Sequence, residues 1–132
     1  MSSVFHYGTD RLTVDKTIAI ASGKLKAVLG QDAIRKVNAS HASVKQIVET
    51  NKTVYGVNTG FGILANTAIS AEDTATLQYK ILQSHSVGVG DPIPAEVAKL
   101  MLITKVHALA QGFSGVQLST LERIIWHIEN NI

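Results

Sequence analysis

Hydrophobic residues recur along most of this chain with the spacing of α-helices. Between residues 32 and 51, Val37, Val44, Ile47 and Val48 recur at intervals of one or two helical turns, as on a buried helix face. Other segments show similar apolar faces, so the pattern predicts a mainly α-helical chain. The expected helices span residues 13–23, 32–51, 70–88, 95–111 and 119–132.

Capping residues mark the expected starts of three of these helices. Thr13 is a suitable N-cap for the first helix. Ser70 with Asp73, and Ser119 with Glu122, have the spacing of capping boxes, in which the two side chains satisfy backbone N–H groups reciprocally.

The helix at residues 95–111 has no broad polar face. A helix that is apolar all round is expected to be buried on all sides, either at the centre of this domain or under another chain. Pro94 stands near its first position, and Gly112 and Gly115 end it.

Two short strands are expected in the first thirty residues, at residues 3–7 and 24–29. The expected fold is therefore mainly α, with these two strands at its beginning. A chain of 132 residues falls within the usual size of one domain, about 100–150 residues, and no repeat or linker divides it. We expect a single region.

The composition favours a folded subunit of an assembly. Hydrophobic residues make up 45% of the chain and charged residues only 17%, which is too apolar for a disordered tail. So low a charged fraction indicates that a partner covers further apolar surface. The net charge is +2, and the Lys and Arg residues form no stripe, which argues against a nucleic-acid partner.

The chain carries no feature of a secreted or membrane protein. It has no Cys, which excludes disulfides and thiolate zinc sites and agrees with a reducing compartment. The first eight residues lack the basic and apolar regions of a signal peptide. The apolar runs are far shorter than the roughly 18 residues of a membrane span. A cytoplasmic protein without a membrane partner is expected.

The glycine-rich segment at residues 53–66 is the first candidate for chemistry. Tyr55 is followed by Gly56, Gly60 and Gly62, and glycines let a backbone take positive φ or approach a ligand closely. The segment lacks the Lys-Ser/Thr of a Walker loop, so phosphate binding is not expected. Either Tyr55 presents its phenol as an acid or base, or the segment is an ordinary turn with a half-buried tyrosine.

The second candidate is the Ser84-His85-Ser86 cluster near the end of a predicted helix and beside Gly88. Such a polar cluster is unusual for packing alone, although a single histidine is more often a structural residue than a ligand contact. The other four histidines lack the His-x-x-His or His-x-x-x-His spacing of metal ligands, so no metal is expected.

Four sequence blocks stand in order along the chain, at residues 54–62 (VYGVNTGFG), 77–78 (LQ), 84–88 (SHSVG) and 112–115 (GFSG). Together they resemble the N-terminal part of the aromatic amino-acid ammonia-lyases, and specifically the histidine ammonia-lyases. The resemblance runs from about Leu12 to the end of the chain. Each block alone would be a weak signal, whereas four in order make a strong one.

The resemblance implies an activity and a base. Members of this family are mainly α-helical cytoplasmic homotetramers that eliminate ammonia from an amino acid, and histidine then gives urocanate. Tyr55 corresponds to the catalytic tyrosine of a mobile loop, which removes a β proton from the substrate. Gly56 and Gly62 would act as hinges that allow the loop to close over a dry site.

The resemblance also implies which residues bind the substrate. His85 corresponds to the position that recognises the ring, and Ser84-His85 resembles the histidine-selective pair, whereas Phe-Leu or His-Leu suits phenylalanine or tyrosine. A buried Ser-His pair facing a phenyl ring would be penalised by about 1–3 kcal/mol per unpaired group. Asn58, Thr59 and Gly60 would shape the site near the substrate.

The cofactor of this family is not expected to come from this chain. The family's electrophile, methylidene-imidazolone (MIO), forms from an Ala-Ser-Gly tripeptide well downstream of the tyrosine block. The chain holds only Ala21-Ser22-Gly23, upstream of Tyr55, which we interpret as a coincidence. Residues 1–132 then end before the cofactor-forming segment, and a base without the electrophile is expected to be inactive alone.

Two other functions stay open at this point. A phenylalanine or tyrosine ammonia-lyase or aminomutase would share the same blocks. A protein of another class, a non-catalytic helical module that assembles with itself, would account for the apolar helices without any site.

Overall fold

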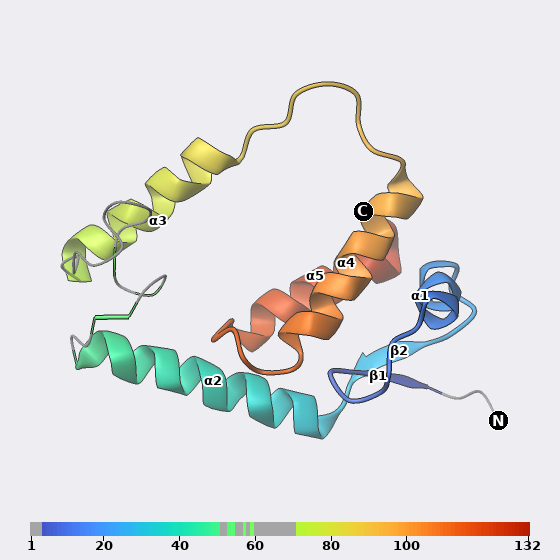
Figure 1. Cartoon of the computed structure of the whole chain (residues 1–132), viewed down its shortest axis with the longest axis horizontal. Coiled ribbons are helices and arrows are strands. Elements are labelled where there is room, and N and C mark those ends of the chain that lie inside the picture. Colours follow the sequence, from blue (N-terminus) through green and yellow to red (C-terminus); the bar gives the residue numbers. More distant parts are fainter. Residues whose placement is uncertain (1–3, 51–52, 55–56, 58, 60–70) are drawn as a thin grey trace. The chain divides into compact units, whose positions relative to one another are not determined.

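The computed structural model describes residues 4–50, 53–54, 57, 59 and 71–132, and Figure 1 shows its elements. The chain divides into two compact units. The first comprises Met1–Ala42 and Ile93–Ile132, and the second comprises Ser43–Pro92.

Two short strands pair in parallel in the first unit, as expected for the first thirty residues. β1 (Phe5–Tyr7) lies beside β2 (Ala27–Leu29), with Phe5 opposite Ala27. A parallel pair needs a crossover connection, and α1 (Val14–Ala21) lies within it. The first and last side chains of β1 point to the same face, and both are buried.

The first helix begins at the predicted cap. Thr13 has an extended backbone, and its hydroxyl accepts a hydrogen bond of 3.4 Å from the N–H of Lys16. Thr17 and Ile20 form the buried side of α1. The helix ends at Ala21, with Ser22 as its C-cap, so both its start and its approximate length are confirmed.

The core of the first unit lies between α1, α4 (Ala95–Leu109) and α5 (Leu118–Asn130). α4 packs against both of the other helices, and α4 and α5 run side by side in Figure 1. The α5 stripe predicted from sequence supplies fully buried Leu121 and nearly buried Ile128. The buried hydrophobic residues are Phe5, Tyr7, Ile20, Ala27, Ala33, Val37, Ile103, Val106, Ala110, Leu121 and Ile128.

α4 is not enclosed on all sides within this chain, contrary to one of the two expectations from its composition. Ile103 and Val106 are fully buried, but Met101 is 58% exposed and Val97 44% exposed. The helix contributes one face to the core because its neighbours in the first unit, α1 and α5, cover only that side. The other expectation, that another chain covers the remaining surface, stays a prediction.

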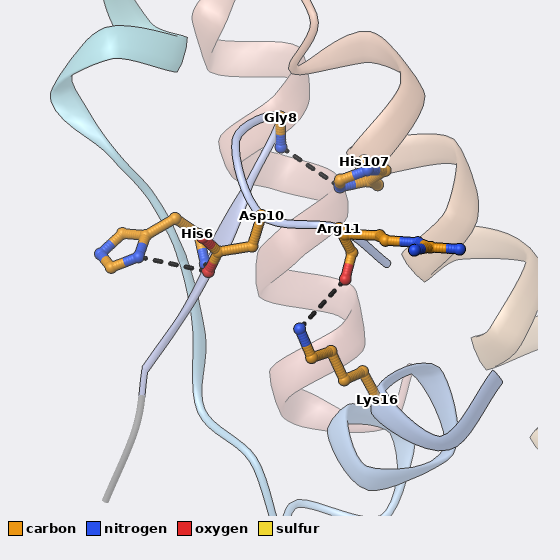
Figure 2. A network of polar contacts seen from close by, with 6 residues as sticks. All are labelled: His6, Gly8, Asp10, Arg11, Lys16 and His107. Atoms are coloured by element: carbon orange, nitrogen blue, oxygen red, sulfur yellow. Dashed lines mark hydrogen bonds and ion pairs between the residues drawn. The ribbon is translucent and has the colours of Figure 1, made fainter. Parts of the chain in front are cut away.

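The turn after β1 rests on the end of α4 (Figure 2). Gly8 has a φ of 77°, and a Cβ atom there would lie 2.4 Å from the carbonyl oxygen of Ala110. Its N–H donates a hydrogen bond of 3.2 Å to Nδ1 of His107, one turn before Ala110. Asp10 closes the turn by accepting the N–H of His6 at 2.8 Å. Only glycine fits this position, because it needs positive φ and has no room for a side chain.

The turn between α4 and α5 is held by α2 (Gln31–Glu49). Gly115 donates its N–H to Oγ of Ser40 at 2.9 Å, and its carbonyl oxygen lies 2.9 Å from Nδ1 of His41. Gly112 has a φ of 80°, and a Cβ atom there would lie 2.6 Å from a side-chain atom of α2. The predicted helix break at these glycines is therefore confirmed, and it also creates a close contact with α2.

The capping box predicted at Ser119 and Glu122 is wrong. α5 begins at Leu118, with Gln117 as its N-cap and no side-chain hydrogen bond at the cap. Ser119 lies inside the first turn, where its hydroxyl donates to Oε1 of Gln117 at 3.5 Å. The backbone stays extended only as far as Gln117, so the helix starts before the serine.

The second unit contains the end of α2, a few described residues at 53–59, and α3 (Ala71–His85). Ser70, the predicted cap of this helix, lies outside the described residues. α3 ends at His85, before the glycines at which it was expected to stop, and the segment from residue 86 to residue 92 is exposed. Among the described residues of this unit, only Thr59 is classed as buried.

Candidate functional site

The predicted site residues fall into two groups in the structure. Thr59, Ser84 and His85 are described, and Thr59 is only 2% exposed. The other predicted residues lie outside the described residues. They are Tyr55, Gly56, Asn58, Gly60 and Gly62.

Ser84 and His85 occupy the last turn of α3 and contact each other. Oγ of Ser84 lies 2.8 Å from Nδ1 of His85, and it also donates a hydrogen bond of 3.1 Å to the carbonyl oxygen of Ile81. Nδ1 of His85 lies 3.1 Å from the same carbonyl oxygen. The imidazole is thus held at one nitrogen by the end of its own helix.

The two side chains are exposed, whereas the selectivity argument from sequence assumed a buried pair. Water can solvate an exposed serine and histidine, so a phenyl ring beside them would not carry the full cost of burying unpaired polar groups. The discrimination expected from that argument therefore requires a cover over the last turn of α3. Among the described residues, the hydrogen bonds of His85 are made within α3, to Ser84 and Ile81, and the ring stays exposed.

The carbonyl of Ile81 is the member of this arrangement that the sequence analysis missed. Near the C-terminal end of a helix the last carbonyl groups have no partner within the helix. A side chain four positions later lies over the same turn, so the i, i+4 relation between Ile81 and His85 could have indicated the contact. The sequence blocks alone point only to the serine and the histidine.

Ala21-Ser22-Gly23 does not fit the role of a cofactor precursor. Ser22 is the exposed C-cap of α1, and its Oγ donates to the carbonyl oxygen of Ala19 at 3.2 Å. The N–H of Gly23 donates to the carbonyl oxygen of Ile20 at 3.0 Å, and its φ is 73°. These are the contacts of an ordinary helix end, with the tripeptide on the surface of the first unit.

Three of the other histidines have structural partners in the first unit. His107 accepts the N–H of Gly8, His41 contacts the carbonyl of Gly115, and His6 lies 3.5 Å from Asp10. Across the part of the chain that the structure describes, no group of three or more His, Cys, Asp or Glu side chains could hold a metal ion.

Within the described segments, no helix combines the length and the hydrophobicity needed to cross a bilayer.

Comparison with known proteins identifies one family, and the curated relatives similar in sequence include histidine ammonia-lyases. Residues 12–132 match the family described as aromatic amino acid lyase. A histidine ammonia-lyase of Streptococcus pyogenes serotype M1 is 38% identical over 125 residues, which is 95% of this chain and 24% of the relative. A histidine ammonia-lyase of Streptococcus sanguinis strain SK36 shows the same identity and coverage.

Solved structures agree with this similarity. The histidine ammonia-lyase of Trypanosoma cruzi is 31% identical with a TM-score of 0.81, over 96% of this chain and 25% of that one. The tyrosine aminomutase of Streptomyces globisporus is 26% identical with a TM-score of 0.87, over 98% of this chain and 25% of that one. The chain spans about a quarter of the length of the curated relatives it matches.

Proposed function

Because the chain belongs to the aromatic amino acid lyase family, we propose that it supplies the N-terminal part of a histidine ammonia-lyase. Such an enzyme eliminates ammonia from L-histidine and releases urocanate, a step of histidine breakdown. The 38% identity to histidine ammonia-lyases over 95% of the chain supports this substrate. The activity is that of a protein of the length of these relatives, with the present chain as one part of its site.

The Ser84-His85 pair is the observation that carries the proposal. It stands in the block that the resemblance assigns to ring recognition, and its two polar side chains lie 2.8 Å apart at the end of α3. An imidazole ring can both donate and accept hydrogen bonds, so it matches a polar pair. A phenyl ring offers neither.

Tyr55 is the proposed base, by resemblance and from chemistry. The Cβ proton of histidine passes to the phenolate oxygen, and the C–H electron pair becomes the new Cα–Cβ double bond. The Cα–N bond breaks with its electrons on nitrogen, so the protonated amino group leaves as ammonia. The Cβ proton is weakly acidic, which demands a strong base held close in a site without water. Gly56 and Gly62 would let the loop close, while Asn58, Thr59 and Gly60 would line the site.

The MIO group of this family has no fitting source in the described part of the chain, since Ala21-Ser22-Gly23 forms an ordinary helix end. We therefore derive no step of the reaction through the MIO group. The 132-residue chain alone is proposed to be inactive, since a base cannot by itself expel the amine.

A phenylalanine or tyrosine ammonia-lyase or an aminomutase is the alternative within the family. The similarity to a tyrosine aminomutase, with a TM-score of 0.87, supports a common fold for both activities. Ser84 and His85 favour histidine, because Phe-Leu or His-Leu at these positions would suit the other rings.

A chimera tests the proposal. Residues 12–132 of this chain would replace the matching quarter of the Streptococcus pyogenes histidine ammonia-lyase, with the parent enzyme as control. We expect urocanate absorbance to rise with L-histidine and no product from L-tyrosine. Tyr55→Phe should abolish turnover, and His85→Ala should chiefly raise KM for histidine.

Three results would count against it. Turnover of tyrosine in place of histidine would move the assignment to the alternative within the family. Unchanged turnover in Tyr55→Phe would remove the proposed base. Urocanate formation by the isolated 132-residue chain would refute its proposed inactivity.

A non-catalytic self-assembly module is the second candidate, and one surface favours it. A groove of about 590 Å³ lies between α1 and α4, where Val14, Ile18 and Leu100 line it with largely apolar surface. Val14 and Ile18 are themselves exposed. This candidate predicts an oligomer in light scattering and no heat of histidine binding in calorimetry; a monomer would exclude it.

A further inference from the structure

The three atoms at the end of α3 form a closed triangle. Oγ of Ser84 lies 3.1 Å from the carbonyl oxygen of Ile81 and 2.8 Å from Nδ1 of His85, and Nδ1 lies 3.1 Å from the same carbonyl oxygen. All three distances lie within the range of hydrogen bonds. Each of the three contacts therefore needs one donor and one acceptor.

Only one placement of protons satisfies the whole triangle. A carbonyl oxygen can accept but never donate, so both Ser84 Oγ and His85 Nδ1 must direct a proton toward Ile81. The serine hydroxyl has a single proton, which leaves its oxygen to accept from Nδ1. The Nδ1 proton is then shared between two oxygens, as in the three-centre bonds common at helix ends.

The opposite tautomer would leave the triangle in conflict. With the proton on Nε2, the lone pair of Nδ1 would face the carbonyl oxygen of Ile81 at 3.1 Å, which is repulsive. The serine hydroxyl would then have to choose between the nitrogen and the carbonyl. One of the two contacts would stay without a proton.

We propose, on the basis of the function proposed above, that the carbonyl of Ile81 and the hydroxyl of Ser84 together hold His85 in the Nδ1–H tautomer and so leave Nε2 as an acceptor. Ser84 is then a positioning residue: as the second acceptor of the Nδ1 proton it strengthens this tautomer. The ring that His85 recognises must therefore present an N–H donor. Imidazole meets this need, whereas a ring whose single nitrogen only accepts does not. In this role Ser84 acts through His85.

The tautomer itself is measurable in the chain without any activity. Imidazole ¹⁵N shifts and ¹H–¹⁵N couplings of His85, recorded where the ring is neutral, distinguish Nδ1–H from Nε2–H. We expect Nδ1–H to predominate in the unmodified chain and to lose population in Ser84→Ala. Ser84→Thr keeps the hydroxyl and should restore it. Ser86→Ala changes a neighbouring exposed serine outside the triangle and should leave the tautomer unchanged.

The ligand class is tested in the chimeric lyase with L-histidine and with 3-(pyridyl)alanine, whose ring nitrogen only accepts. The unmodified chimera should prefer histidine in kcat/KM, and Ser84→Ala should narrow that preference by about tenfold, as expected for one hydrogen bond. The change should appear in KM rather than in kcat, and Ser84→Thr should reverse most of it.

The two arms separate failure of this inference from failure of the proposed function. Predominant Nε2–H in the unmodified chain, or an unaltered tautomer in Ser84→Ala, overturns the role of Ser84 even if the chimera converts histidine. An Nδ1–H ring in a chimera that acts on tyrosine and not on histidine supports the tautomer and overturns the proposed substrate. An unchanged ligand preference in Ser84→Ala also overturns the inference.

Discussion

The two compact units of the chain differ in how much buried apolar surface stabilises each of them. Among the residues that the structure describes, every buried hydrophobic one belongs to the first unit, Met1–Ala42 with Ile93–Ile132. The described part of the second unit, Ser43–Pro92, contributes to burial through Thr59, a polar residue. Leu82 on α3 is 63% exposed, whereas Leu121 on α5 is fully buried.

This contrast separates a scaffold from the segment to which the proposed chemistry is assigned. Burial of apolar surface is the main favourable term in folding, so the first unit has its own source of stability. The predicted base and the ring-recognition pair both belong to the second unit, which shows little burial in its described residues. A site that must close over its substrate is expected to lie in a segment of low local stability.

The contrast is tested most strongly by shortening one leucine in each unit. Leu121→Ala removes a fully buried side chain and should lower the free energy of unfolding by about 3–4 kcal/mol, from lost burial and a new cavity. Leu82→Ala, on exposed α3, should change it by less than about 0.5 kcal/mol. Urea unfolding followed by circular dichroism measures both.

Equal losses in the two leucine variants would contradict the contrast. They would mean that α3 packs as tightly in solution as α5 does. A large loss in Leu82→Ala alone would reverse it and place the stable core in the second unit.

The next largest effect is expected at a glycine where the backbone meets another segment. Gly8→Ala should cost about 2–3 kcal/mol, since the new Cβ would lie 2.4 Å from a backbone oxygen and the residue has positive φ. Gly23→Ala is the matched control, because its φ is also positive, at 73°, but nothing lies within 4 Å of the new atom. It should cost about 1 kcal/mol, from backbone strain alone.

Unfolding temperatures of the two glycine variants give the comparison. If both fell equally, the cost would come from positive φ alone, and the close approach of the turn to Ala110 would not hold in solution.

The sequence predicted the local features of the first unit because local features have local causes. Thr13 caps α1, the apolar stripe of α5 is buried at Leu121 and Ile128, and α4 ends before Gly112 and Gly115. Each of these follows from the preferences of one residue or from a periodic pattern. The four sequence blocks likewise identified the family, which the family match over residues 12–132 confirms.

The features that sequence analysis missed join residues far apart in the chain. Gly8 and His107 are 99 positions apart, and Ser40 and Gly115 are 75 positions apart, so no local pattern connects them. Ser119 failed as a cap because the turn before α5 decided where the helix starts. The apolar composition of α4 likewise could not reveal whether its cover lies in this chain.

The hydrogen bond from Gly115 to Ser40, which holds the turn after α4, should contribute less to the free energy of unfolding. Ser40→Ala removes the acceptor of the Gly115 N–H, a partly buried bond of 2.9 Å, and should cost about 1 kcal/mol. Ser22→Ala removes an exposed serine bond of 3.2 Å that water can replace, so its effect should be near zero. Chemical denaturation compares the two, and hydrogen exchange at Gly115 should quicken only in Ser40→Ala. No change in Ser40→Ala would show that α2 does not hold the turn.

The smallest effect is expected from pH, at the contact between Gly8 and His107. Burial lowers the pKa of His107 below 6.5, while the nearby Asp10 carboxylate acts in the opposite direction. Asp10 stays ionised, since the backbone N–H of His6 lowers the pKa of its carboxyl group. His6 and Arg11 on the strand and turn, and Lys16 on α1, are the other charged or titratable groups around this turn in Figure 2.

The sign of this effect follows from which state binds the proton. The unfolded ring titrates near pH 6.5, and the folded ring titrates lower because its burial disfavours the charged form. Protonation of Nδ1 would also remove the lone pair that accepts the N–H of Gly8. The contribution of the ring to stability is therefore fully present above about pH 7 and is lost as pH falls from about 6.5 through the lower folded pKa. His107→Asn places an amide oxygen near the position of Nδ1 and does not titrate, so it should flatten this part of the curve. Unfolding free energies at pH 7.5 and 5.5 are compared between the unmodified chain and His107→Asn. The two proteins share every other histidine, so the difference in pH dependence comes from His107. Parallel curves would show that His107 holds the turn equally well when charged, and the contact would then be packing without a protonation requirement.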